Sequence, residues 1–160
     1  MSHPVINPVR LLRFFFLSLC LTGPLFGPAS VTAQAQDQGL QWPLGLAPAL
    51  SSTFGETRST AFHAGIDLKP WGKTGYAVHA AGDGWVERAR MSPWGFGRAI
   101  YVRLKDGRIA VYAHLDSFFT PIQERIRAEQ RAQGHYSVQL WFEKGEIPVK
   151  RGQVIAATGQ

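Results

Sequence analysis

Two residues in the stretch FHAGIDLK, His63 and Asp67, carry side chains that could do chemistry together. They lie four residues apart around Gly65, in a run that otherwise alternates as a strand does. On an extended strand both side chains point to the same side, but their backbones lie ~13 Å apart. Two ligand atoms of one tetrahedral zinc ion lie only about 3.3 Å apart. The strand must therefore contract, and it can do so at Ala64 and Gly65, because glycine accepts backbone angles that other residues refuse.

A metal site would explain the histidine, the acid and the glycine at once. The alternative is that His63 and Asp67 form an ordinary ion pair or cap a turn. The H-x-x-x-D pattern is short, and its spacing alone leaves both interpretations open.

A hairpin is predicted in RAIYVRLKDGRIAVYAH, where Asp106 and Gly107 form a two-residue turn between two β-prone runs. In that register Leu104 faces Ile109 on an apolar side of the pair. The other face then carries three pairs: Arg103 with Ala110, Tyr101 with Tyr112, and Ala99 with His114. This predicts that His114 sits at a strand end on a polar and aromatic surface.

One helix is predicted over residues 120–133, in TPIQERIRAEQRAQG. Thr120 is expected as N-cap, Pro121 in the first turn, Gln123 as the partner in a capping box and Gly134 as the stop. The segments YSVQLWF and GQVIAATG that follow are predicted strands. The expected fold class is mostly β, with antiparallel sheets and this single helix.

The first 35 residues are typical of a secretory signal peptide: Arg10 and Arg13 precede an apolar run, and small residues end it at Ala35. A membrane anchor is the alternative, but glycines and prolines interrupt the run, which is too short for the ~20 residues that cross a bilayer. Cys20 could mark a lipoprotein signal, although the bulky Leu19 precedes it. We therefore expect an exported protein, periplasmic or extracellular, with no stable membrane span after cleavage.

The composition of the chain limits its domain organisation and the kinds of chemistry and partner it can have. Residues 36–53, rich in Gly, Pro, Gln and Ser, are expected to be a linker or N-terminal arm before a domain at 54–160. That domain has no cysteine, which excludes disulfides and thiol chemistry. Without Arg10 and Arg13 the formal net charge falls from +6 to +4, and no motif points to nucleic acid.

Four blocks, in order, are FGETRSTAFHAGIDLK, YAVHAAGDGWV, RAIYVRLKDGRIAVYAHL and GEIPVKRGQVIAATGQ. Together they resemble the lysostaphin/LytM-type zinc metallopeptidases, from about Phe54 to Gln160. The resemblance implies an antiparallel β architecture with an open groove, the duplicated hybrid motif. It also implies an exported enzyme that hydrolyses peptide bonds of bacterial peptidoglycan, so that peptidoglycan peptides are the expected partners and Zn2+ the cofactor.

By the same resemblance His63 and Asp67 are zinc ligands, and His114 in YAHL is a catalytic histidine that does not bind the metal. The family's third ligand belongs to an H-x-H block that is absent from these 160 residues. We therefore expect the domain to be C-terminally incomplete here and this chain to be inactive by itself. Tyr101 and Tyr112 are expected either to line the groove or to form a plain cross-strand pair.

Two other functions stay open. The chain could be a catalytically degenerate LytM-like module that binds or regulates cell-wall hydrolases, or an exported polysaccharide-binding β module. The second would use some of five tryptophans as stacking platforms, although a core role for at least some is expected: Trp42, Trp71, Trp85, Trp94 and Trp141. Of the remaining histidines, His79 is interpreted as a strand residue and His135 as a surface residue.

Overall fold

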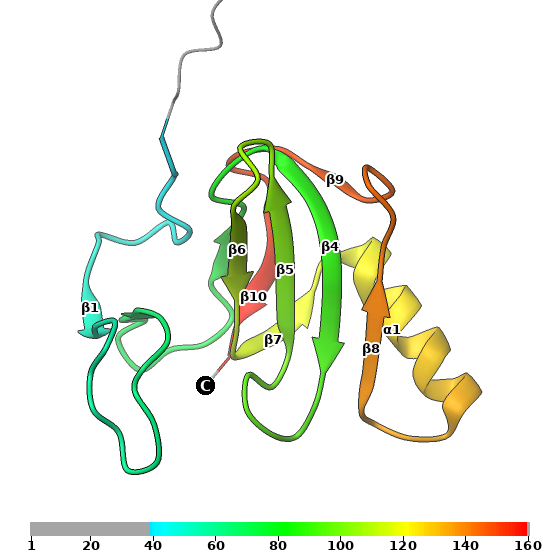
Figure 1. Cartoon of the computed structure of the whole chain (residues 1–160), viewed down its shortest axis with the longest axis horizontal. Coiled ribbons are helices and arrows are strands. Elements are labelled where there is room, and N and C mark those ends of the chain that lie inside the picture. The colour runs from blue at the N-terminus through cyan, green and yellow to red at the C-terminus, as the bar shows by residue number, and fades with distance from the viewer. Residues whose placement is uncertain (1–38, 160) are drawn as a thin grey trace, which may run out of the picture. The chain divides into compact units, whose positions relative to one another are not determined.

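The computed structural model describes residues 39–159, which form three antiparallel sheets and one helix (Figure 1). A two-stranded sheet pairs β1 (Leu50–Ser52) with β2 (Asp67–Leu68). A three-stranded sheet has the order β3-β10-β7, with bounds Ala77–His79, Val154–Thr158 and Leu115–Phe118. The expected mostly β fold with a single helix is confirmed.

The five-stranded sheet is the largest, and its strand order is β6-β5-β4-β8, with β9 also pairing with β4. Its bounds are Ile109–Tyr112 (β6), Ala99–Leu104 (β5), Gly84–Met91 (β4), Val138–Trp141 (β8) and Pro148–Val149 (β9). In Figure 1 its strands stand in front of β7 and β10, and α1 (Thr120–Gln133) lies beside β8.

The hydrophobic core draws on both larger sheets and on the helix. Ile100 and Val102 of β5, Ile155 of β10, and Ile122 and Ile126 of α1 are all completely buried or nearly so. The helix contributes because these two isoleucines are four residues apart and so share one face. Burial of such side chains from water is the main term that holds the sheets together.

The β5–β6 hairpin forms as predicted, but its register is one residue away from the prediction. Gly107 has φ 90°, and the backbone N–H of Leu104 donates to the carbonyl of Arg108, so the loop has three residues rather than two. Ile100 then pairs with Tyr112 instead of Ala113, and Tyr112 turns into the core. The prediction that Tyr112 pairs with Tyr101 on an open face is therefore wrong.

The helix is present over residues 120–133, as expected, and it ends at Gly134, whose φ of 70° and N–H bond to Gln130 form the C-cap. Its start differs from the prediction. Phe119, not Thr120, is the N-cap, and no side chain caps it; the Gln123 side chain accepts a hydrogen bond from the Phe118 N–H instead. Pro121 alone marks the first turn as expected.

The segment expected to be a linker or arm contacts the domain where the structure describes it. Leu44 is buried and bridges to Val78, and β1 begins at Leu50. The predicted signal peptide and Cys20 lie outside residues 39–159. Within that range no helix is long and apolar enough to cross a membrane.

Candidate functional site

His63 and Asp67 meet beside the small β1–β2 sheet, because the chain between them does not continue as a strand. β2 begins only at Asp67, and the residues from Ala64 to Ile66 are irregular, so the contraction falls where the sequence predicted it. The Nε2 atom of His63 lies 3.2 Å from Oδ1 of Asp67. That separation matches the spacing of two ligand atoms on one tetrahedral metal ion, about 3.3 Å.

A short backbone ladder holds His63 in place. The N–H of Gly55 donates to the carbonyl of His63 at 2.8 Å, and the N–H of His63 donates to the carbonyl of Glu56 at 2.8 Å. The turn closes where the Arg58 N–H reaches the carbonyl of Ala61 at 2.9 Å. The histidine is thus set by the backbone that precedes it rather than by the larger sheets.

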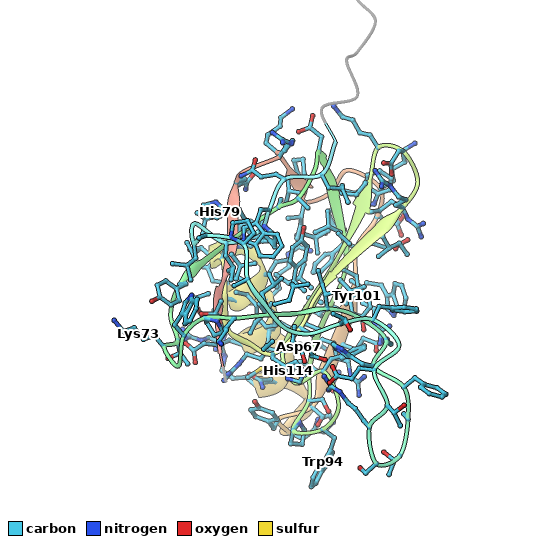
Figure 2. The ribbon with its side chains drawn as sticks, turned by 90° about the vertical axis from the view of Figure 1, so that its left-hand side faces the viewer. Asp67, Lys73, His79, Trp94, Tyr101 and His114 are labelled. Atoms are coloured by element: carbon cyan, nitrogen blue, oxygen red, sulfur yellow. The ribbon has the colours of Figure 1, made fainter. Side chains whose placement is uncertain are left out.

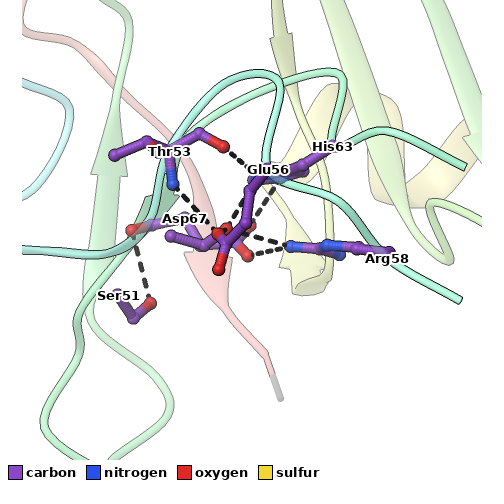
Figure 3. Close-up of polar contacts among 7 residues, drawn as sticks. Ser51, Thr53, Glu56, Arg58, His63 and Asp67 are labelled. Carbon is purple, nitrogen blue, oxygen red and sulfur yellow. Dashed lines mark hydrogen bonds and ion pairs between the residues drawn. The ribbon is translucent and has the colours of Figure 1, made fainter.

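The other ring nitrogen of His63 is engaged inside this loop (Figure 3). Nδ1 lies 2.9 Å from the carbonyl oxygen of Thr53 and 2.9 Å from the Ser52 hydroxyl oxygen. A carbonyl can only accept a hydrogen bond, so the contact with Thr53 assigns the proton to Nδ1. The lone pair of Nε2 then faces Asp67, as it does in metal-binding histidines whose other nitrogen donates to a carbonyl.

The second carboxylate oxygen of Asp67 is held by an arginine. Nη2 of Arg58 donates to Oδ2 of Asp67 at 2.5 Å and lies 3.4 Å from the Ser52 hydroxyl (Figure 3). Oδ1 is left facing His63. Arg58 therefore orients the carboxylate so that one oxygen is available beside Nε2.

Glu56 completes the network through Ser52 and Thr53, the two residues that contact Nδ1 of His63. Its carboxylate accepts hydrogen bonds from the Ser52 hydroxyl and from the Thr53 N–H, the latter at 3.3 Å. The Ser52 hydroxyl bond, followed by the Thr53 N–H bond, holds the pKa of Glu56 below its usual value. Glu56 thus stays charged and keeps Ser52 and Thr53 in place behind the imidazole.

The His63 and Asp67 side chains suit a cation. A neutral imidazole lone pair and a carboxylate oxygen repel each other at 3.2 Å unless a proton or a metal ion lies between them. The imidazole is largely shielded while the carboxylate is 39% exposed, so the pair is reachable from solvent. Among residues 39–159, however, no group of three or more His, Cys, Asp or Glu side chains is placed to hold a metal ion.

His114 lies in the turn between β6 and β7, exposed to solvent (Figure 2). Its φ of 53° is left-handed, which is uncommon for a residue other than glycine and is found at functional positions more often than elsewhere. Its N–H donates to the carbonyl of Phe96 at 3.0 Å, so it does not pair with Ala99 as the predicted register required. In the part of the chain that the structure describes, no hydrogen bond or ion pair joins His114 to His63 or Asp67.

The two remaining histidines of the described region lie elsewhere. His79 ends β3, its Nδ1 is 2.9 Å from the carbonyl of Gly152, and Figure 2 shows it well apart from Asp67. His135 follows the helix and is exposed. Neither contributes to the cluster around His63.

Sequence reasoning missed the residues behind the two predicted ligands: Ser52, Thr53, Glu56 and Arg58. Glu56 and Arg58 lie in the block FGETR, next to the predicted ligands in the sequence. The roles of all four residues depend on which atoms the folded loop brings together, so the sequence alone could not assign them.

A family model gives an independent comparison. The model of peptidase family M23 matches residues 61–132, a range that contains His63, Asp67 and His114. No curated protein and no solved structure matches the chain significantly. The match supports a peptidase-like, hydrolytic function and is consistent with the LytM-type resemblance of the sequence. Over residues 61–132 the chain is thus similar to peptidase family M23.

Proposed function

We propose that this chain carries the metal-binding part of an exported, zinc-dependent endopeptidase that cleaves peptide bonds of bacterial peptidoglycan. The observation that carries the proposal is the 3.2 Å approach of His63 Nε2 to Asp67 Oδ1, with the opposite ring nitrogen bonded to the Thr53 carbonyl. Export and the peptidoglycan substrate rest on the predicted signal peptide and on the family resemblance.

Bound zinc would supply a water molecule of lowered pKa and a Lewis acid for the scissile carbonyl. The residues of this chain have separate tasks. His63 offers Nε2 because Thr53 accepts the proton of Nδ1, and Asp67 offers Oδ1 because Arg58 holds Oδ2. His114, solvent-exposed on its turn, would move a proton or donate to the developing oxyanion.

Catalytic zinc normally has three protein ligands, whereas His63 and Asp67 provide two. The resemblance assigns the third to the second histidine of an H-x-H pair, and residues 1–160 contain no such pair. By themselves these residues are therefore expected to bind zinc weakly and to be inactive on peptidoglycan.

The test measures metal content in protein expressed from the complete coding sequence and purified without chelator. We expect about one zinc per chain in the unchanged protein, and a large loss in Asp67→Ala and His63→Ala. Asp106→Ala is the matched control, because Asp106 is an exposed aspartate that pairs with Arg108 in the β5–β6 turn. Zinc content unchanged by Asp67→Ala would overturn the ligand assignment.

The degenerate binding or regulatory module is the second candidate. What favours it is that, within residues 39–159, His63 and Asp67 have no third His, Cys, Asp or Glu side chain placed beside them to hold a metal ion. The same purification separates the two functions. Protein that holds no zinc but binds peptidoglycan in a sedimentation assay would support the module and contradict the enzyme.

A further inference from the structure

A row of four side chains crosses the outer face of the five-stranded sheet. Register pairs Val111 of β6 with Tyr101 of β5, Tyr101 with Arg88 of β4, and Arg88 with Trp141 of β8. Directly paired residues point to the same face of a sheet. Val111 is 45% exposed and Trp141 is 64% exposed, so this face is turned to solvent.

Arg88 is stacked between the two aromatic rings of this row. Its guanidinium carbon lies 4.6 Å from the centre of the Tyr101 ring and 5.1 Å from a Trp141 ring centre. A planar guanidinium held over aromatic rings keeps its N–H donors in its own plane, pointing away from the rings. The protein uses one donor group, because Nη2 bonds to the side-chain oxygen of Gln139, while Nε is buried with no hydrogen-bond partner in the described region.

No carboxylate of residues 39–159 pairs with Arg88. The nearest acid along the strand, Glu87, is engaged by Arg103 through two bonds of 2.8 and 3.0 Å. Arg90 continues β4 and pairs in register with Gln139, the residue that Arg88 contacts. This side of the sheet therefore carries more positive than negative charge, with a fixed, uncompensated guanidinium at its centre.

We propose that Arg88, clamped by Tyr101 and Trp141, is a binding subsite for a carboxylate of the peptide substrate. The inference rests on the proposed peptidase function for the identity of the ligand. A planar carboxylate can accept hydrogen bonds edge to edge from a guanidinium, and these charge-assisted bonds are roughly twice as strong as neutral ones. The flanking rings strengthen the contact because they shield it from water on both sides.

Binding of a carboxylate probe tests the subsite without zinc or cleavage. The probes are N-acetyl-trialanine with a free C-terminal carboxylate and the same peptide as its C-terminal amide, titrated into the full chain. The readout is the chemical shift of the Trp141 indole N–H and of the Arg88 side-chain N–H groups. We expect the acid to bind at least about fivefold more tightly than the amide, because only the acid forms charge-assisted bonds.

Three variants show whether the preference for the acid depends on the guanidinium held between Tyr101 and Trp141 or only on positive charge in this strand. Arg88→Met should abolish the preference for the acid, and Arg88→Lys should reduce it, since lysine keeps the charge but not the planar fork. Arg90→Met, which removes the same charge from the same strand, should retain most of the preference. Equal binding of acid and amide by the unchanged protein, or equal effects of the Arg88→Met and Arg90→Met changes, would overturn the proposal.

The outcome is separable from that of the proposed function. Absence of zinc in the complete protein, with the acid preference intact, would contradict the peptidase proposal, and the anion subsite on the sheet would remain supported. Absence of the acid preference, with zinc and activity intact, would contradict the subsite, and the peptidase proposal would remain supported.

Discussion

The backbone N–H of Gly159 donates a hydrogen bond of 2.9 Å to the carbonyl oxygen of His114. A Cβ atom at position 159 would lie 2.6 Å from that oxygen and 3.0 Å from the backbone nitrogen of Asp116. The end of the last strand thus fits against the left-handed turn of the exposed histidine only because residue 159 has no side chain.

Gly159→Ala is therefore expected to displace the His114 turn. Overpacking of this kind costs typically about 1–3 kcal/mol, so the melting temperature should fall by several degrees. Thermal unfolding and the chemical shifts of the His114 ring measure the effect. Gly45→Ala is the control, because a Cβ there meets no atom within 4 Å. An unchanged His114 spectrum in the Gly159 variant would contradict the close approach.

Under the proposed function, a catalytic histidine and a zinc ligand should fail differently when removed. In protein from the complete coding sequence, His114→Ala should keep its zinc and lose peptidoglycan cleavage by about 100-fold or more, as expected when proton transfer or oxyanion stabilisation is removed. His135→Ala, at an exposed position after the helix, should keep both. Loss of zinc from the His114 variant would make His114 a ligand instead.

Arg58 would have two opposing effects on a cation bound by His63 and Asp67. It orients Asp67, but its charge also repels a metal ion nearby. Both side chains are well exposed, so solvent screens the repulsion, and loss of such an orienting partner typically costs about 10–100-fold in metal affinity. Arg58→Ala should therefore weaken zinc binding by about tenfold in a competition titration, while Arg131→Ala on the helix should not. Tighter binding would show that repulsion dominates.

Tyr112 should matter for stability rather than for the groove. Its hydroxyl accepts a hydrogen bond of 2.7 Å from the buried N–H of Ala81, and burial raises the pKa of the phenol. Tyr112→Phe leaves that N–H without a partner, which costs about 1–3 kcal/mol of unfolding free energy. Tyr101→Phe makes the same chemical change on the outer face and should be nearly neutral. Urea unfolding of both variants decides between the observed register and the predicted one.

Asp83 should give the protein part of its acid sensitivity. The Arg151 N–H bond, followed by the Lys105 side chain, holds the pKa of Asp83 below its ordinary value of 3.8. An acid with a lowered folded pKa stabilises the fold above its unfolded pKa, and the contribution disappears as pH falls through the folded pKa. The melting temperature of Asp83→Ala should therefore lie below that of the unchanged protein at pH 6, with the gap narrowing toward pH 2. A constant gap would contradict this.

Local signals in the sequence predicted the elements well and the register poorly. Pro121 and Gly134 bounded the helix because each acts through its own backbone. Asp106 and Gly107 located the hairpin, but one residue more in the loop moved Tyr112 from one face of the sheet to the other. Side-chain alternation has a period of two, so a one-residue error inverts the face assignment of every residue in β6, while Ile100 and Val102 of β5 stay on the buried face as predicted.

His63 and Asp67 show the same difference between what local sequence predicts and what only the folded chain determines. The spacing of His63 and Asp67 predicted a contraction at Gly65, because strand geometry and the size of a metal's coordination sphere together require one. The roles of Ser52, Glu56 and Arg58 depend on side chains meeting across a folded turn. Only the three-dimensional arrangement could assign those contacts.

The position of β10 between β3 and β7 has a consequence for how the chain folds. β10 pairs Val154 with His79 and Ala156 with Phe118, so the central strand of this sheet follows both of its neighbours in the sequence. During synthesis β3 and β7 leave the ribosome without the strand that joins them. The five-stranded sheet, with its β4–β5–β6 neighbours in succession, can assemble earlier. Closure of the three-stranded sheet depends on contacts distant in sequence, so we expect it to be a slow, late step of folding.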